Sequence, residues 1–145
     1  SDGTWMINAR VNGSGYRYTH KSTDHGETWV TKKETNLPDP GCNAEPLVYT
    51  SKKDGFSMDR LLFVNSHSQK GRKNLVLSLS YDNGRTWAHK KCIEKGPAGY
   101  STLTSCENGD IGIFFENGKK MTFVRVTLND LTDSQDKLSK PYKIK

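Results

Sequence analysis

Short apolar segments alternate with polar turns along almost the whole chain. The segments are rich in β-branched and aromatic residues and are bounded by Gly, Asn, Asp or Pro, which is typical of β-strands. They predict strands at residues 3–11, 16–22, 28–34, 45–51, 60–66, 73–80, 86–92, 100–106, 110–116 and 120–127. Turn sequences such as NGSG, NLPDPG and ENGKK separate them at the roughly 8–12-residue spacing of antiparallel all-β proteins. The segment 128–140 indicates a helical turn or two.

Two eight-residue turns repeat one pattern, STDHGETW and SYDNGRTW, and begin 80 − 22 = 58 residues apart. The shared positions are Ser22, Asp24, Gly26, Thr28 and Trp29 in the first copy and Ser80, Asp82, Gly84, Thr86 and Trp87 in the second. Each copy follows one predicted strand, and its Trp begins the next, which predicts a β-hairpin. We expect the Asp and the hydroxyls to close the turn, the Gly to adopt a left-handed conformation and the Trp ring to cover the loop.

This motif is the Asp box, and the chain resembles the sialidase (neuraminidase) family of β-propellers, in which the box joins the third and fourth strands of a blade. The resemblance implies an all-β, six-bladed propeller, of which this chain is about half. Strands 45–51 to 86–92 would form one complete blade, with three strands of a blade before it and three after it. Residues 1–130 would then be the C-terminal half of the propeller and residues 131–145 a tail. The implied partner is the N-terminal half of the same domain.

Composition changes this picture little. A length of 145 residues fits one domain, and 32% hydrophobic content makes the core lean. The net charge is +6, but the lysines scatter through turns and the tail, so we expect no nucleic-acid partner. No apolar run approaches the ~18 residues of a membrane span, and the first ten residues lack the basic start and apolar stretch of a signal peptide.

The cysteines and histidines show no metal-ligand spacing. Cys42, Cys92 and Cys106 are far apart and form no CxxC pair, so at most one disulfide could form and its pairing stays open. The four histidines are equally scattered, at positions 20, 25, 67 and 89. We therefore expect no metal and no cofactor.

The resemblance also implies a chemistry. Sialic acid carries a carboxylate on the carbon that is attacked, and Arg pairs with a carboxylate through a planar fork. The nucleophile should not itself be an anion, and sialidases use Tyr. Asp24 and Asp82, by contrast, are expected to close turns rather than to act in catalysis.

Four positions match motifs of the sialidase family. Arg10 ends DGTWMINAR and resembles the second Arg of the carboxylate-binding triad, and Arg72, in SQKGRKNLVLSLS, resembles the third, with Arg60 as the alternative. Tyr100, in YSTL before ENGDIGIFFE, resembles the nucleophile, and Glu116 resembles the Glu that orients the first triad Arg. Each position also has a purely structural alternative, such as a solvated strand-end Arg, a core Tyr or a turn carboxylate.

Other parts of the family's site have no counterpart here. The first triad Arg, the acid/base Asp and the Glu that partners the nucleophile are expected upstream of Ser1, and Glu45 stays open as a pocket or turn residue. The resemblance implies an exo-α-sialidase that releases terminal sialic acids from glycoproteins, glycolipids or oligosaccharides with retention. It implies a secreted, periplasmic or cell-surface location, and we expect the isolated chain to be inactive or nearly so. A trans-sialidase and a carbohydrate-binding propeller without catalysis are the alternatives.

Overall fold

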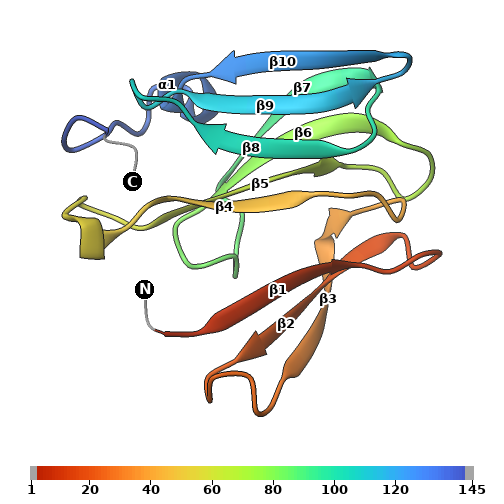
Figure 1. Cartoon of the computed structure of the whole chain (residues 1–145), viewed down its shortest axis with the longest axis horizontal. Helices are drawn as coiled ribbons and strands as arrows, with labels where there is room; N and C mark the ends of the chain where they lie inside the picture. Colours follow the sequence, from red (N-terminus) through yellow and green to blue (C-terminus); the bar gives the residue numbers. More distant parts are fainter. Residues whose placement is uncertain (1–2, 143–145) are drawn as a thin grey trace.

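Ten strands form three antiparallel sheets in the computed structural model, which describes residues 3–142 (Figure 1). The first sheet contains β1 (Trp5–Arg10), β2 (Tyr16–Ser22) and β3 (Val30–Pro38). The second sheet contains β4 (Glu45–Thr50), β5 (Arg60–Ser66), β6 (Lys73–Ser80) and β7 (His89–Pro97). The third sheet contains β8 (Ser101–Ser105), β9 (Ile111–Asn117) and β10 (Lys120–Val126).

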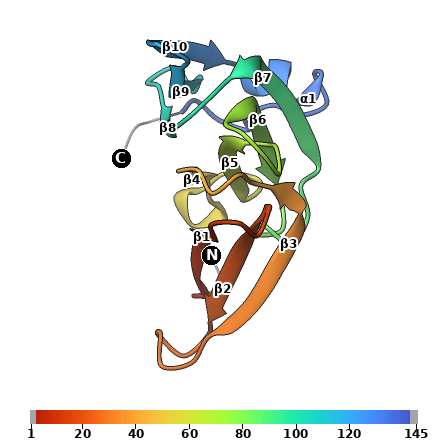
Figure 2. The same ribbon diagram turned by 90° about the vertical axis from the view of Figure 1, so that its right-hand side faces the viewer.

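Each sheet is an up-and-down meander in which consecutive strands are neighbours. The sheets stack in chain order, and Figure 2 shows the same stack from the side. All ten predicted strands are present, and the four-stranded sheet lies between two three-stranded ones, as expected for one complete blade flanked by two incomplete blades. Among the described residues the sheets do not close on themselves, which fits part of a propeller.

One boundary prediction was wrong in both Asp boxes. Trp29 and Trp87 do not begin strands, because β3 starts at Val30 and β7 starts at His89. Both tryptophans belong to the turns. The indole N–H of Trp29 donates to the carbonyl of Gly26 at 3.0 Å and so completes the turn before the next strand begins.

The first Asp box is closed by its own side chains. Ser22 Oγ accepts the N–H of Gly26 at 2.7 Å and donates to Asp24 Oδ1, also at 2.7 Å. Asp24 in turn accepts the backbone N–H of Thr28 at 2.9 Å and its hydroxyl at 2.5 Å. These bonds from Thr28, followed by that from Ser22, lower the pKa of Asp24 to about 2. The carboxylate therefore stays ionised as an acceptor, as expected for a turn-closing residue.

The second box repeats this geometry. Ser80 Oγ accepts the N–H of Gly84 at 2.9 Å, and Asp82 accepts the N–H and hydroxyl of Thr86 at 2.8 and 2.7 Å. Two consecutive residues are left-handed in each copy: Asn83 (φ 57°) precedes Gly84 (φ 77°), and the first copy has the same arrangement. Asn is one of the few residues besides Gly that adopt this conformation readily, so Asn83 can take the first of the two left-handed positions.

The two interfaces between sheets differ in character. The interface between the second and third sheets is apolar, and its buried members include Leu62, Leu77, Ile113 and Phe115. The interface between the first and second sheets holds buried polar groups, among them Arg17, Thr19, Glu34 and Asn65. Hydrophobic burial therefore joins the last two sheets, whereas polar groups take part in joining the first two: Asn65 donates to the carbonyl of Pro38 at 2.8 Å, and the Cζ atom of Arg17 lies 5.6 Å from the centroid of the Phe63 ring.

The predicted helical turn is α1 (Leu128–Thr132), and η1 (Lys52–Asp54) is a short 3₁₀ turn. Thr127 caps α1, because its Oγ1 accepts the N–H of Asp130 at 3.0 Å while the Asp130 side chain accepts the N–H of Thr127 at 3.3 Å. Among residues 3–142, no helix is long and apolar enough to cross a membrane.

The tail after α1 returns to the second sheet. Arg60, 1% exposed, binds Asp136 through two bonds, Nε to Oδ2 at 2.7 Å and Nη2 to Oδ1 at 2.5 Å. Farther on, the Tyr142 ring stacks on Tyr49 with centroids 5.2 Å apart. The part of the predicted tail at 143–145 lies outside the described residues. The described part of the tail thus packs against the second sheet.

Candidate active site

Corresponding hairpins of the three sheets lie at one end of the molecule (Figure 1). Arg10 ends β1 before the first hairpin, Arg72 precedes β6 in the second, and Glu116 lies near the end of β9 before the third. Tyr100 immediately precedes β8, beside the end of β9. All four residues selected from the sequence therefore come to the same end of the stack, opposite the Asp-box turns (Figure 1).

Tyr100 lies under two guanidinium groups. The Cζ atom of Arg10 is 5.8 Å from the centroid of the Tyr100 ring, and the Cζ atom of Arg72 is 4.7 Å from it. The ring remains 42% exposed, so a ligand can reach it. Hydrogen bonding to Arg10 and then to Arg72 lowers the pKa of Tyr100, and Tyr100 raises the pKa of Arg10. The arrangement is an accessible phenol that ionises more easily than usual, beside two cations that can bind an anion.

Glu116 binds the backbone that carries Tyr100. Its Oε2 atom accepts the N–H of Tyr100 at 3.0 Å. The main chains are also paired, because the N–H of Glu116 donates to the carbonyl of Tyr100 at 2.9 Å. Glu116 is thus a direct neighbour of Tyr100, while its expected role of orienting the first triad Arg stays a prediction.

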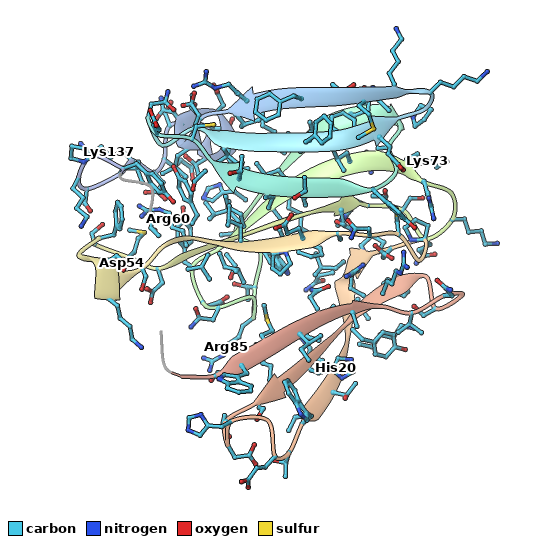
Figure 3. All side chains as sticks on the ribbon, viewed as in Figure 1. His20, Asp54, Arg60, Lys73, Arg85 and Lys137 are labelled. Atoms are coloured by element: carbon cyan, nitrogen blue, oxygen red, sulfur yellow. The ribbon has the colours of Figure 1, made fainter. Side chains whose placement is uncertain are left out.

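The alternative for the second cation, Arg60, lies elsewhere. Figure 3 shows Arg60 and Lys137 at one end of the molecule and Lys73, the neighbour of Arg72, at the other. The ion pair with Asp136 occupies the Arg60 guanidinium. Arg60 is therefore placed as a structural residue, and Arg72 is the one brought to Tyr100.

Glu45 spans two sheets. It begins β4, and its Oε2 atom accepts the N–H of Leu103 at 2.9 Å and the hydroxyl of Thr102. These groups lie on the edge of β8 that no described strand pairs with. Glu45 therefore connects the second sheet to the strand that follows Tyr100.

A buried cation that was not predicted, Arg17, lies in the strand paired with that of Arg10. Arg17 stands opposite Arg10 in the β1–β2 register and is 3% exposed. Its Nε donates to Asn8 Oδ1 at 2.6 Å, and its Nη1 donates to the carbonyl of Cys42 at 2.8 Å and forms an ion pair with Asp39 at 3.3 Å. Burial lowers the pKa of Arg17, and Asp39 opposes that shift. The only signal in the sequence was that Arg17 and Thr19 are two residues apart in β2 and therefore lie on the same face of the strand.

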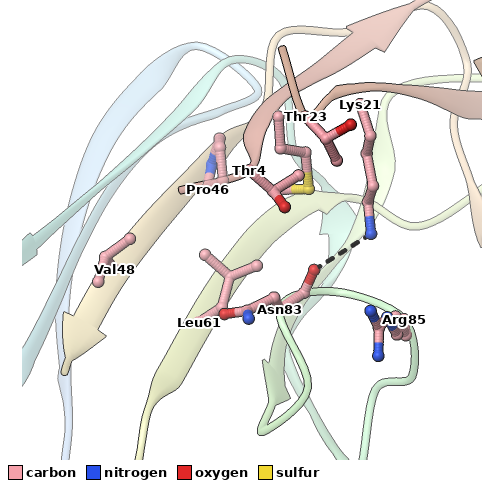
Figure 4. Close-up of a pocket in the computed structure, with 9 residues that line it drawn as sticks. Thr4, Lys21, Thr23, Pro46, Val48, Leu61, Asn83 and Arg85 are labelled. Atoms are coloured by element: carbon pink, nitrogen blue, oxygen red, sulfur yellow. Dashed lines mark hydrogen bonds between the residues drawn. The ribbon is translucent and has the colours of Figure 1, made fainter. Parts of the chain in front are cut away.

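A separate cavity of about 370 Å³ lies between the first two sheets, near the second Asp box (Figure 4). Met6, Val48 and Leu61 contribute apolar walls, and Lys21 and Arg85 contribute charge. None of the four candidate residues lines it, so it is distinct from the Tyr100 site.

The described residues show no cluster of three His, Cys, Asp or Glu side chains able to hold a metal ion. The three cysteines are free thiols, buried at Cys42, exposed at Cys92 and intermediate at Cys106.

Known proteins resemble the chain over most of its length. The family model described as BNR repeat-like domain matches residues 1–113. A sialidase of Bacteroides fragilis is 33% identical over 135 residues, which cover 89% of this chain and 25% of that protein. A sialidase of Micromonospora viridifaciens is 33% identical over 132 residues, 88% of this chain and 20% of that protein. The chain thus spans a quarter or less of the length of these two relatives.

Solved structures of sialidases also resemble most of the chain. The Hadza microbial sialidase Hz136 has a TM-score of 0.78 at 30% identity, over 89% of this chain and 26% of that one. The NanB sialidase of Streptococcus pneumoniae has a TM-score of 0.75 at 22% identity, over 91% of this chain and 23% of that one, and supports the fold alone. The resemblance read from the Asp boxes and the all-β, sialidase-type propeller fold are both confirmed. The chain belongs to the sialidase family with Asp-box (BNR) repeats and is part of its β-propeller.

Proposed function

We propose that the protein containing this chain is an exo-α-sialidase that hydrolyses terminal sialic acids from glycoproteins, glycolipids or oligosaccharides. The observation that carries the proposal is the exposed Tyr100 ring beside the guanidinium groups of Arg10 and Arg72. Relatives named sialidases at 33% identity support the enzyme class. We also propose a secreted, periplasmic or cell-surface location, because sialylated glycans lie mostly outside cells.

In this proposal Arg10 and Arg72 bind the carboxylate of the sugar. Both side chains are exposed, and each presents a planar fork of N–H donors to an anion. Binding the carboxylate between them would place the neighbouring anomeric carbon near the Tyr100 hydroxyl. Glu116 would orient the first triad Arg, which this proposal assigns outside the chain.

Tyr100 then attacks the anomeric carbon. A bond forms between the phenol oxygen and that carbon, the bond to the leaving oxygen breaks, and the leaving oxygen takes a proton from an acid. Water later displaces the phenol oxygen from the same carbon, so two inversions give net retention. The two guanidiniums favour this step because they lower the pKa of Tyr100.

The isolated chain should have little or no activity. The proton donor to the leaving group and the base that takes the phenol proton are assigned outside it. Removing one general acid or base costs ~10²–10⁴-fold, and here two are missing together.

The test is hydrolysis of a fluorogenic α-sialoside by the whole protein, beside its Tyr100→Phe variant. Turnover by the protein with near-complete loss in the variant would support both the activity and the nucleophile. Retained turnover in Tyr100→Phe would refute the assignment of the nucleophile. No turnover in either, with sialic acid bound in an Arg72-dependent way, would favour a carbohydrate-binding propeller. Added acceptor sugar would reveal a trans-sialidase by a new sialylated product.

A further inference from the structure

Gly99, the residue before Tyr100, has no room for a side chain while Glu116 keeps its present conformation. It is buried, and a Cβ atom built there would overlap Glu116 Oε2 and lie 3.2 Å from the Cβ of Glu116. The backbone is not the reason for a glycine, because Gly99 is not among the residues with positive φ. The space is occupied by the carboxylate that accepts the N–H of Tyr100.

The segment Ala98–Tyr100, which we call the bracket, is held from several sides. Its first N–H donates to the carbonyl of Arg72 at 2.9 Å, and its first carbonyl accepts the hydroxyl of Ser66 at 2.5 Å. The N–H of Gly99 donates to the carbonyl of Glu116 at 2.8 Å. The bracket therefore connects the backbone of one cation of the site, the backbone of Tyr100 and the carboxylate of Glu116.

We propose that Gly99 is a positioning residue: its missing side chain lets Glu116 bind the bracket, and the bracket then holds the Tyr100 ring against Arg10 and Arg72. The inference rests on the proposed function, because it takes Tyr100 as the nucleophile. A methyl group at position 99 must displace the Glu116 carboxylate, the bracket or both. Displacing a reacting group by about 1 Å can cost on the order of 10²-fold in rate.

The kinetic test is Gly99→Ala in the whole protein, assayed with a fluorogenic α-sialoside. We expect kcat to fall about 100-fold and KM to change less than kcat, because Arg10 and Arg72 still bind the substrate carboxylate although Glu116 is displaced. Gly96→Ala is the matched control. Gly96 also has no positive φ, its N–H donates to Glu94 Oε1 at 2.6 Å, and a Cβ there would lie 3.0 Å from that oxygen. It lies in β7, outside the bracket, and should leave kcat unchanged.

A double-mutant cycle tests whether Gly99 acts through Glu116. In a Glu116→Ala background the overlap with the carboxylate is gone and only the 3.2 Å contact with the Cβ at position 116 remains, so Gly99→Ala should cost far less than it does with Glu116 present. The same loss in both backgrounds would overturn the inference, as would an unchanged kcat in Gly99→Ala with Glu116 present. Unfolding midpoints of all variants separate a shifted site from a lost fold.

A readout without turnover separates this inference from the proposed function. The pKa of Tyr100 can be followed by NMR of ¹³Cζ-labelled tyrosine, and it should rise in Gly99→Ala as the ring moves away from the guanidiniums. It should stay unchanged in Gly96→Ala. If the protein hydrolyses no sialoside, the proposed function fails, but the titration still tests whether Gly99 positions the Tyr100 ring. An unaltered Tyr100 pKa in Gly99→Ala would refute the positioning role.

Discussion

Replacing Asp136 by Ala should destabilise the chain strongly, because it leaves Arg60 charged and buried without its carboxylate. The exposed fractions of the two side chains are 0% for Arg60 and 8% for Asp136. Asp136 also accepts the hydroxyl of Tyr81 at 2.9 Å. Removing one partner of a buried, hydrogen-bonded ion pair costs about 3–5 kcal/mol. The remaining bonds of Arg60, to Thr50 Oγ1 at 3.1 Å and the carbonyl of Lys137 at 3.2 Å, supply no negative charge.

Urea unfolding of the chain, followed by tryptophan fluorescence, measures this effect. With an m-value of about 2 kcal/mol/M, a loss of about 4 kcal/mol lowers the midpoint by about 2 M. The matched control is Asp133→Asn, at an exposed residue with φ 50°, a conformation that Asn tolerates. Its effect should stay within about 0.5 kcal/mol. A midpoint for Asp136→Ala equal to that of the control would refute the reasoning.

Two further measurements examine the same pair. The double variant, Arg60→Met with Asp136→Leu, should recover much of the stability that Asp136→Ala loses, because no unpaired charge stays buried. Burial opposes ionisation of Asp136, but the hydrogen bonds from Arg60 and Tyr81 outweigh it and hold its pKa below 3.8. Because the pKa of Asp136 is lower in the folded than in the unfolded state, its ionised form stabilises the fold at a pH above the ordinary carboxyl pKa. This stability is lost as the pH falls through the pKa of the folded state. The double variant should lack this acid sensitivity.

Three other outcomes are expected. Arg72→Ala should raise the pKa of Tyr100 toward its ordinary value, as read by NMR titration of the labelled ring, since Arg72 lowers it in the native site. Gly84→Ala should destabilise the chain more than Gly71→Ala in urea unfolding, because both have positive φ but only a Cβ at Gly84 meets a neighbour, at 3.3 Å; equal losses would contradict this. Burial and, to a lesser degree, Lys90 lower the pKa of His67 to about 4, so stability should fall as the pH drops from about 6.5 toward 4, and His67→Gln should flatten that slope.

The strands could be predicted because turn residues and apolar alternation are local signals, and the two Asp boxes carry their closing bonds within eight residues. The strand starts at Trp29 and Trp87 were misjudged, because an aromatic residue after a turn resembles a strand residue even when its ring belongs to the turn. Arg17 and Arg60 were not recognised as buried. A lone Arg in a strand resembles a solvated one, and the partners Asp39 and Asp136 lie 22 and 76 residues away.

The site itself was partly predictable. The motifs selected Arg10, Arg72, Tyr100 and Glu116, and the structure brings these four together. What no local pattern indicated was how the main chain links them. The bond from Ala98 to the carbonyl of Arg72 and the exclusion of a side chain at Gly99 depend on strands that are distant in the sequence.

The hairpins that carry the candidate site and the Asp-box turns lie at opposite ends of the same strands. Substitutions in the hairpins at 11–15 and 67–72 can therefore change the ligand surface without touching the side-chain bonds that close the boxes. Selectivity and foldability can evolve separately in such a molecule. A mutational library confined to these hairpins should retain a larger fraction of folded members than one of equal size placed in the Asp boxes.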